Sequence, residues 1–443
     1  WRQRYHGTAP AMLQPASTGH VAAIMAAATR HRVPIVAQGG NSSMVGGATP
    51  PADGRALIVS LRRLDRIRSI DAAAGFAVVE AGVILETLHG AAIDAGARFP
   101  LTLGAKGSAT VGGLVSTNAG GTQVLRFGSM RGLVAGIEAV FADGGIHDGL
   151  SPLKKDNRGY DLTQLLVGAE GTLGIVTAAT LRLVPLAPTR SAAWAGTDTP
   201  AAALTLLRRF QAATDALESF EILPCESLDA VLRHVPGTRS PLGGVHRWHL
   251  LIETTDERGN ALIERELARA LDDGLIADAT IAASETQVGD FWRIRDSISD
   301  SERALGPASQ HDLSVPVEAM PGFMMAAATA CEAAFPGTHA SGFGHLGDGN
   351  IHFHVRAAPG TDPSRWYADD VPRVTRFVDD LVIAAGGSIA AEHGIGQMKI
   401  DELERLASPA RLNALRRVKA GLDPLGLLNP GKLVRVAQAD ATQ

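Results

Sequence analysis

The spacing of hydrophobic residues in the first 190 positions predicts two helices and several short strands. The segment STGHVAAIMAAATRH, residues 17–31, places apolar residues at helical spacing behind Ser17 or Thr18 as the N-cap. A second helix, ILETLHGAAIDAG, ends at Gly96. Runs of apolar and β-branched residues predict strands at 33–37, 56–60, 76–83, 134–141 and 173–184. Glycine-rich loops fill the interval up to about residue 132.

The second half of the chain continues this alternation after a proline-punctuated exit, VPLAPT, which places a domain boundary near residue 187. Helical spacing predicts helices at 200–213, 257–271 and 363–384, and alternation predicts strands at 248–253, 277–283 and 350–356. FWRIRDSIS, residues 291–299, predicts an amphipathic helix with Arg295 and Ser299 on one face. Apart from a short polar C-terminal tail there is no low-complexity segment, and the pattern favours the α+β class.

Composition narrows the range of partners. The 443 residues are 45% hydrophobic and 20% charged, and a net charge of −5 gives no electrostatic reason to expect nucleic acid as a partner. No apolar run reaches the roughly 18 residues that span a bilayer. The nearest candidate, FMMAAATACEAAF from Phe323, is expected to be a buried helix.

The cysteine count and the first residue bear on location. Two cysteines, Cys225 and Cys331, exclude a disulfide framework and a four-cysteine zinc site, so we expect a reducing compartment, the cytoplasm. The chain begins at Trp1 with no Met and no signal-peptide pattern. We therefore expect the native N-terminus, with any targeting segment, to lie before Trp1.

Two glycine-rich segments are the strongest sign of cofactor binding: QGGNSSMVGGA (38–48) and GAKGSATVGGLVSTNAGG (104–121). Such segments expose many backbone N–H groups with little side-chain obstruction, which suits the binding of a pyrophosphate. The alternative is a pair of mobile surface loops, but the apolar residues inside both segments argue against it. A Walker A motif is absent, because Leu433 replaces the Ser or Thr that follows GxxxxGK.

The segment GFGHLGDGNIHFH, residues 342–354, supports two incompatible interpretations. Its glycines spell GxGxxG, the fingerprint of a dinucleotide-binding turn, but that turn must follow a strand and begin a helix. The residues that follow, IHFHV, alternate with a period of two and predict a strand instead. We therefore reject the dinucleotide-binding turn and take the histidines as the candidate chemistry.

His345 and His352 flank a tight Gly-Asp-Gly turn, and Glu392 and His393 follow about forty residues later. In a strand that begins at 350, His352 and His354 point to the same face. Two imidazoles and a carboxylate form a divalent-metal site with open positions, as catalytic sites do. From spacing alone, the alternative that these are separate polar residues on loops is equally supported.

Six segments, taken together, resemble one family. In chain order they are GGNSSMVGG, TVGGLVSTNAGGTQVLRFGSMRGLVAGIEAVFADG, KKDNRGYDLTQLLVGAEGTLGIVTAATLRL, GHLGDGNIH, AEHGIG and LNPGK. They resemble the FAD-linked D-2-hydroxyacid dehydrogenases, which include D-2-hydroxyglutarate dehydrogenase, D-lactate dehydrogenase and the flavin subunit of glycolate oxidase. These are flavoproteins of the vanillyl-alcohol-oxidase or p-cresol methylhydroxylase (PCMH) type.

The resemblance implies an α+β fold in three parts. A two-lobed FAD-binding domain would span 1–187, an α+β cap domain for the substrate 188–385, and a C-terminal segment that returns to the flavin 386–443. The implied FAD-binding residues are Gln38, Gly39, Gly40, Asn41, Ser42, Ser43, Met44, Gly104, Ser108, Thr110, Gly112, Gly113, Thr117, Asn118, Ala119, Gly120, Glu170, Gly174, Ile175 and Asn429. Some relatives attach FAD covalently through a histidine, but these segments contain none, so we expect non-covalent FAD.

The resemblance also assigns His345, His352 and Glu392 as ligands of a divalent metal, with Zn²⁺ as the expected ion, and His393 as the base beside the substrate. A 2-hydroxy acid chelates such a metal through its hydroxyl and one carboxylate oxygen, and this lowers the pKa of the hydroxyl. His393 takes that proton while hydride leaves Cα for the flavin, and a 2-keto acid results.

In the family, the helix face that carries Arg295 and Ser299 binds the distal carboxylate of the substrate, since a guanidinium pairs with a carboxylate through two bonds. The alternative is a surface arginine that pairs with Asp296 or Glu302.

Two further substrate-binding positions depart from the family pattern. Gln310 stands where a Lys is usual, and His354 where an Asn is usual. The expected reaction is the oxidation of D-2-hydroxyglutarate to 2-oxoglutarate, with D-lactate, D-malate and glycolate oxidase-type activity as alternatives. A metal-dependent hydrolase and a silent flavin-binding module are further hypotheses. An electron-transfer flavoprotein or a quinone pathway is the expected electron acceptor, and a homodimer the expected oligomer.

Overall fold

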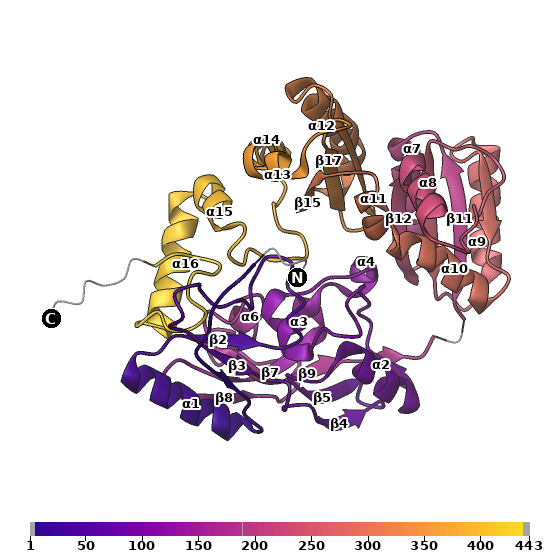
Figure 1. The fold of residues 1–443 in the computed structure, drawn as a ribbon. Coiled ribbons are helices and arrows are strands. Elements are labelled where there is room, and N and C mark those ends of the chain that lie inside the picture. Colours follow the sequence, from indigo (N-terminus) through magenta and orange to yellow (C-terminus); the bar gives the residue numbers. More distant parts are fainter. Residues whose placement is uncertain (1–4, 188, 437–443) are drawn as a thin grey trace. The chain divides into compact units, whose positions relative to one another are not determined.

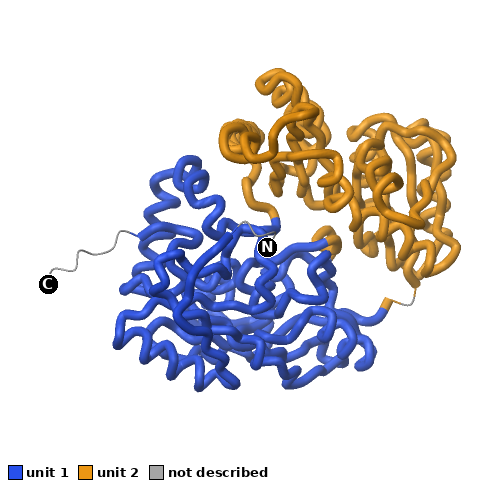
Figure 2. Tube along the Cα trace, viewed as in Figure 1, with its two compact units in different colours: residues 1–121, 127–186, 392–443 blue, residues 122–126, 187–391 orange. Residues whose placement is uncertain are grey.

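The computed structural model describes residues 5–187 and 189–436, and the end of the chain, with its polar tail, lies outside them (Figure 1). The described residues form two compact units (Figure 2). Unit 1 contains the residues up to Gly121, those from Phe127 to Leu186, and those from Glu392 onward. Unit 2 contains Thr122–Arg126 and Ala187–Ala391.

Unit 1 is built on two main sheets. Three parallel strands have the order β1–β3–β2: β1 (Met12–Leu13), β3 (Leu57–Ser60) and β2 (Ile35–Gln38). Five antiparallel strands have the order β4–β5–β9–β7–β8: β4 (Ile67–Asp71), β5 (Phe76–Glu80), β9 (Ile175–Arg182), β7 (Val134–Val140) and β8 (Ile146–Gly149). A short pair consists of β6 (Ala97–Arg98) and β10 (Val184–Pro185).

Helix α1 (Thr18–His31) joins the two sheets of unit 1. The predicted N-cap is confirmed, because the backbone N–H of His20 donates to Ser17 Oγ at 3.2 Å. Val21 of α1 lies in one buried cluster with Val59 of the parallel sheet and Val140 of the antiparallel sheet. The second predicted helix is α2 (Leu85–Asp94), which packs on the antiparallel sheet.

The prediction of continuous loop up to residue 132 is wrong. Short helices occur here: α3 (Val111–Thr117), α4 (Val124–Phe127) and α5 (Met130–Leu133). In α3, Val111, Leu114 and Val115 are buried at helical spacing, so their burial outweighs the low helix propensity of the glycines between them. A further short helix, α6 (Leu162–Leu166), precedes β9.

The C-terminal segment completes unit 1. After α15 (Ile400–Leu406) and α16 (Pro409–Leu422), Leu428 forms a parallel bridge with Ile35 of β2. The N–H of Asn429 donates to the carbonyl of Ile35 at 2.7 Å. The end of the chain therefore continues the parallel sheet.

Unit 2 is a seven-stranded antiparallel sheet with the order β14–β11–β13–β12–β16–β17–β15. The strands are β11 (Ser191–Thr197), β12 (Leu217–Pro224), β13 (Trp248–Thr254), β14 (Asp278–Ile281), β15 (Ala308–Ser314), β16 (His339–His345) and β17 (Asn350–Arg356). The helices are α7 (Pro200–Ala213), α8 (Cys225–His234), α9 (Asn260–Asp272), α10 (Glu285–Asp296), α11 (Ile298–Arg303), α12 (Met320–Ala334), α13 (Pro363–Arg365) and α14 (Val371–Ala384).

Both faces of this sheet carry helices. On one face, α8, α10 and α11 bury a core around Trp194 and Phe343. On the other face, Phe220 contacts Phe210 of α7, and Phe353 contacts Phe323 of α12. None of the helices among the described residues combines the length and the hydropathy that a bilayer span requires.

Candidate active site

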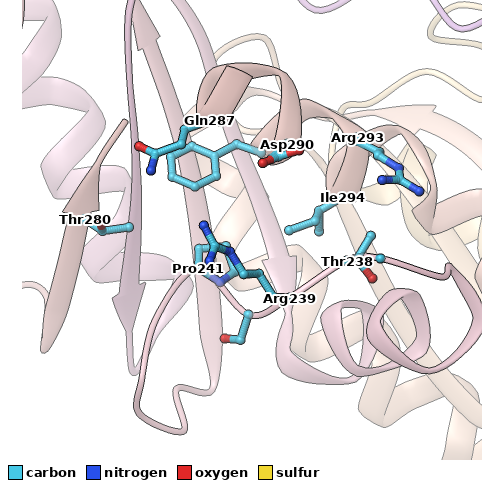
Figure 3. A pocket seen from close by; sticks show the side chains of 11 residues that line it. Thr238, Arg239, Pro241, Thr280, Gln287, Asp290, Arg293 and Ile294 are labelled. Carbon is cyan, nitrogen blue, oxygen red and sulfur yellow. The ribbon is translucent and has the colours of Figure 1, made fainter. Parts of the chain in front are cut away.

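A pocket of about 290 Å³ lies in unit 2 between α10, Thr280 of β14 and the loop 237–241 (Figure 3). Arg239, Asp290 and Arg293 supply its charged side chains. Arg293 is exposed, whereas Arg295, two residues further along α10, is buried. None of the site residues predicted from the sequence lines this pocket, so the candidate chemistry lies elsewhere.

The histidines lie on a face of the sheet that strand pairing defines. β16 and β17 form a hairpin, which confirms the predicted strand at 350–356 and excludes a dinucleotide-binding turn. Paired residues share a face, and side chains alternate between faces along each strand. The shared face, called here the histidine face, carries Glu221 of β12, Gln310 and Asp312 of β15, Phe343 and His345 of β16, and His352 and His354 of β17.

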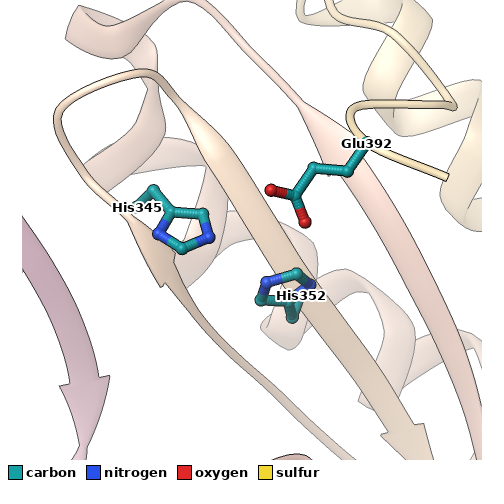
Figure 4. A group of neighbouring side chains, drawn as sticks. All are labelled: His345, His352 and Glu392. Carbon is teal, nitrogen blue, oxygen red and sulfur yellow. The ribbon is translucent and has the colours of Figure 1, made fainter. Parts of the chain in front are cut away.

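A candidate metal centre lies at one end of this face. His345, His352 and Glu392 each offer one ligand atom, and these atoms lie within 4.8 Å of one another (Figure 4). Glu392 directly follows Ala391, the last residue of unit 2. A second set with the same spacing consists of Asp312, Glu392 and His393. Two imidazoles and a carboxylate suit a divalent ion and leave coordination positions open for a substrate.

Glu221 holds two of the predicted site residues at once. His345 Nδ1 donates to Oε1 of Glu221, and Arg295 Nε donates to Oε2, both at 2.7 Å. Burial favours the neutral form of Glu221 and so raises its pKa. The charges of His345 and Arg295 outweigh this and hold the pKa of Glu221 below its ordinary value. In the neutral imidazole that keeps its proton on Nδ1, Nε2 of His345 is the nitrogen available to a metal.

Arg295 is buried and only partly paired. Its guanidinium lies over the ring of Phe343, 5.2 Å from the ring centroid, and its Nη2 has no hydrogen-bond partner. The alternative pairing with Asp296 or Glu302 is wrong, since the partner is Glu221. A buried guanidinium nitrogen without an acceptor is costly, so this atom suits an anionic ligand group.

The prediction of one unbroken helix over 291–299 is also wrong. α10 ends at Asp296, α11 begins at Ile298, and Ser297 caps both. The Ser297 hydroxyl makes no cap hydrogen bond, and the residues on either side of the break, Ile294 and Ile298, are buried in the same cluster. Arg295 and Ser299 therefore lie on consecutive helices.

His354 is engaged by a carboxylate of its own. Its Nδ1 contacts Glu302 of α11, and Ser227 Oγ donates to the other oxygen of Glu302 at 2.6 Å. Burial disfavours this carboxylate too, but the bonds from His354 and Ser227 hold the pKa of Glu302 below its ordinary value. Nδ1 of His354 is thus occupied by Glu302. Sequence reasoning missed Glu221, Glu302 and Asp312 as parts of the site.

The two glycine-rich segments meet in unit 1. A Cβ on Gly39 would lie 2.1 Å from Thr110 Oγ1, and one on Gly40 would lie 1.9 Å from the carbonyl oxygen of Ser108. Thr110 Oγ1 is buried and has no hydrogen-bond partner. This close approach of two backbones, with an unsatisfied hydroxyl between them, fits the binding of a pyrophosphate.

The first of these segments is shaped by its own side chains. Gln38 Nε2 donates to the carbonyl of Ala48 at 3.0 Å, and the N–H of Gly47 donates to Ser43 Oγ at 3.0 Å. In the second segment, the predicted flavin-binding residues Gly112, Gly113 and Thr117 lie within α3, and Asn118 caps its end.

The EGTLGIV and LNPGK motifs lie beside the first segment. Asn429 Nδ2 donates to the carbonyls of Gly47 and Glu170, at 2.9 and 2.7 Å, while its buried Oδ1 has no partner. Ile175 begins β9 with its side chain in the core, so only its backbone is available to a ligand. An unsatisfied buried acceptor next to two glycine-rich segments fits a flavin ring with N–H donors.

The sequence matches two family descriptions. Residues 9–149 match the FAD binding domain, and residues 186–433 match the C-terminal domain of FAD linked oxidases. The chain is 37% identical to the mitochondrial D-2-hydroxyglutarate dehydrogenase of Arabidopsis thaliana, over 98% of this chain and 76% of that protein. It is 33% identical to the D-2-hydroxyglutarate dehydrogenase of Xanthomonas citri pv. viticola, over 99% of this chain and 92% of that protein.

The fold resembles that of a solved enzyme. p-Cresol methylhydroxylase superposes with a TM-score of 0.70 over 95% of this chain and 88% of that chain, at 14% sequence identity. This confirms the predicted α+β fold with an N-terminal FAD-binding domain. The chain belongs to the FAD-linked oxidases of the vanillyl-alcohol-oxidase type, and it is an FAD-linked oxidoreductase homologous to the D-2-hydroxyglutarate dehydrogenases.

Proposed function

We propose that this protein oxidises D-2-hydroxyglutarate to 2-oxoglutarate with FAD and a divalent metal ion, for which Zn²⁺ is our first choice. One observation carries the proposal. A candidate three-ligand metal centre and a buried arginine nitrogen without a partner occur together at the histidine face. The names of the relatives in Arabidopsis and Xanthomonas support the same substrate.

The residues divide the work as follows. His345, His352 and Glu392 hold the ion, and the segments around Gly39, Thr110 and Asn429 hold FAD. When bound, the metal polarises the substrate hydroxyl and FAD accepts a hydride.

His393 removes the proton from the hydroxyl oxygen of the substrate. The O–H and C2–H bonds break and the C2=O bond forms, so two electrons and two hydrogens leave the substrate, one as a proton and one as a hydride. His393 is held beside the metal ligand Glu392 by the chain itself.

Arg295 binds the second carboxylate of the substrate, because its Nη2 is a buried donor that lacks an acceptor. Gln310 favours a second candidate, D-lactate. It supplies a neutral amide where dicarboxylate-binding relatives have a lysine, and Glu302 already occupies Nδ1 of His354. A charged donor contributes roughly 1.5–3 kcal/mol to such a contact, against about 1 kcal/mol for a neutral one.

Anaerobic titration of the flavin distinguishes these substrates. D-2-hydroxyglutarate, D-malate and D-lactate are mixed with wild type, Arg295→Ala and Gln310→Lys, and bleaching of the flavin absorption is followed. We expect D-2-hydroxyglutarate to bleach the wild type fastest, Arg295→Ala to lose this preference, and Gln310→Lys to strengthen it. A wild type that prefers D-lactate, with a rate that Arg295→Ala leaves unchanged, would contradict the dicarboxylate assignment.

A further inference from the structure

The segment that carries Glu392 and His393 has no helix or strand of its own. We call residues 392–397 the EHGIGQ loop. It is fixed in unit 1 through its backbone. The N–H of Gln397 donates to the carbonyl of Val45 at 3.0 Å, and the N–H of Leu433 donates to the carbonyl of Gly396 at 2.9 Å.

The strongest contact of this loop is with one carboxylate. The N–H of Ile395 donates to Glu170 Oε1 and the N–H of Gly396 donates to Glu170 Oε2, each at 2.7 Å. Both oxygens of Glu170 are thus occupied by consecutive backbone donors. Hydrogen bonds from backbone N–H groups to a carboxylate are charge-assisted. They are therefore stronger than hydrogen bonds from the same groups to a neutral peptide carbonyl.

Glu170 is itself held on both sides. Its N–H donates to the carbonyl of Ser116 at 2.7 Å, and its carbonyl accepts Asn429 Nδ2 at 2.7 Å. Its backbone has a φ of +51°, which a residue other than glycine adopts only where its surroundings require it. The side chain therefore projects from a fixed point of the EGTLGIV motif.

The shape of the loop depends on this contact. Gly394 and Gly396 have φ values of +80° and +51°. A Cβ on Gly394 would lie 2.7 Å from Glu170 Oε1, and one on Gly396 would lie 2.3 Å from the carbonyl oxygen of Val45. Only glycine fits such close approaches at positive φ.

Charges near Glu170 support its ionised form. Burial raises the pKa of Glu170, while the two backbone donors and the charges of Lys399 and Lys432 oppose this rise. Lys432 is buried as well, and burial lowers its pKa to about 8 although Glu170 opposes the change.

We propose that Glu170 is a positioning residue that clamps the EHGIGQ loop and so fixes Glu392 and His393. In this account the carboxylate acts on the loop, and any contact of Glu170 with the flavin is made by its backbone. The importance of the clamp for catalysis rests on the proposed roles of Glu392 and His393.

Amide hydrogen exchange of the holoenzyme tests the clamp directly. In Glu170→Gln, an amide –NH₂ replaces one of the two acceptors, so we expect the peptide that covers 392–397 to exchange about 10-fold faster. Glu80→Gln is the matched control, since Glu80 is also buried in unit 1 but binds Arg66 and Arg68 instead of the loop. Exchange that is unchanged in Glu170→Gln, or equally fast in both variants, overturns the proposal.

A second variant approaches the contact from the loop and leaves the buried carboxylate intact. Gly394→Ala pushes a methyl group against Glu170 Oε1, whereas Gly426→Ala introduces a methyl at a similar φ of +65° into open space. We expect faster exchange at 392–397 in Gly394→Ala alone. The same rate in both alanine variants overturns the proposal.

Calorimetric titration of Zn²⁺ into chelator-treated protein adds a readout that general destabilisation does not give. Loss of a residue that orients a metal ligand typically weakens binding about 10- to 100-fold, so we expect this loss in Glu170→Gln and not in Glu80→Gln. The flavin absorption should be retained in both. A wild type whose flavin no 2-hydroxy acid reduces refutes the proposed function, while the exchange rates still decide on the clamp.

Discussion

The EHGIGQ loop of unit 1 and the histidine face of unit 2 hold their site residues in opposite ways. The backbone N–H groups of the loop donate hydrogen bonds to Glu170. The rings of His345 and His354 instead contact Glu221 and Glu302 directly. A backbone clamp fixes the position of a segment whatever its side chains are. A side-chain clamp fixes one ring in one tautomer, so it depends on both partners.

The two kinds of clamp also differ in charge. Glu170 accepts from neutral peptide groups, and burial raises its pKa. Glu221 is buried too, but His345 and Arg295 lower its pKa. We conclude that the histidine face is an ion-paired site, while the loop is a neutral backbone surface that holds one carboxylate.

Loss of a metal ligand should have the largest effect. We expect His352→Ala to lower kcat about 1,000-fold or more, since Lewis-acid polarisation contributes several kcal/mol. The flavin absorption should be unchanged, because the candidate FAD-binding segments lie in other parts of the sequence. His339→Ala, at an exposed position of β16, is the control. Activity that survives in His352→Ala would contradict the metal assignment.

Loss of the proposed base should have the next largest effect. We expect His393→Ala to lower kcat roughly 100-fold or more, within the usual range for loss of a general base, while the zinc content stays near that of wild type. Steady-state kinetics and metal analysis check both points. A change confined to KM would make His393 a binding residue instead.

The two side-chain clamps should have different effects on the metal and the substrate. We expect Glu221→Gln to weaken Zn²⁺ binding about 10- to 100-fold, because it removes the carboxylate that orients His345. Glu302→Gln, the matched variant, should leave Zn²⁺ affinity unchanged and alter the preference among 2-hydroxy acids, because it contacts His354. Equal losses of Zn²⁺ affinity in the two variants would show that both act through general stability.

The last prediction concerns stability against acid and does not involve the site. Burial, with a smaller contribution from His246, lowers the pKa of His249 to about 4, and Nδ1 of His249 accepts a bond from Trp194. Between pH 6.5 and 4 the unfolded chain binds a proton that the folded chain does not, so the free energy of unfolding falls as pH falls. We expect His249 to account for about 3 kcal/mol of this loss. Urea unfolding of His249→Gln should show a shallower pH dependence than wild type, and the exposed control His31→Gln should match wild type.

Local patterns predicted most of the elements. The helix at 200–213 was placed correctly by its helical spacing, and the strand at 350–356 by the alternation of its side chains. The break at Ser297 and the helical glycines of α3 were missed, since tertiary packing decides both.

The clamps of the site could not be predicted in the same way. Glu221 and His345 are 124 residues apart in sequence, and Glu170 and Gly396 are 226 apart. Their contacts follow from the strand register of unit 2 and from the return of the C-terminal segment to unit 1. No local spacing encodes either contact, although a glutamate inside the apolar run SFEILP signals a buried charge that needs partners.

The most direct test of this account measures flavin reduction with and without the metal. Holoenzyme treated with a chelator is mixed anaerobically with D-2-hydroxyglutarate in a stopped-flow instrument, before and after Zn²⁺ is restored. We predict that the metal-free protein keeps its flavin absorption but is not reduced, and that added Zn²⁺ restores rapid bleaching. Rapid reduction of the metal-free protein would contradict the account.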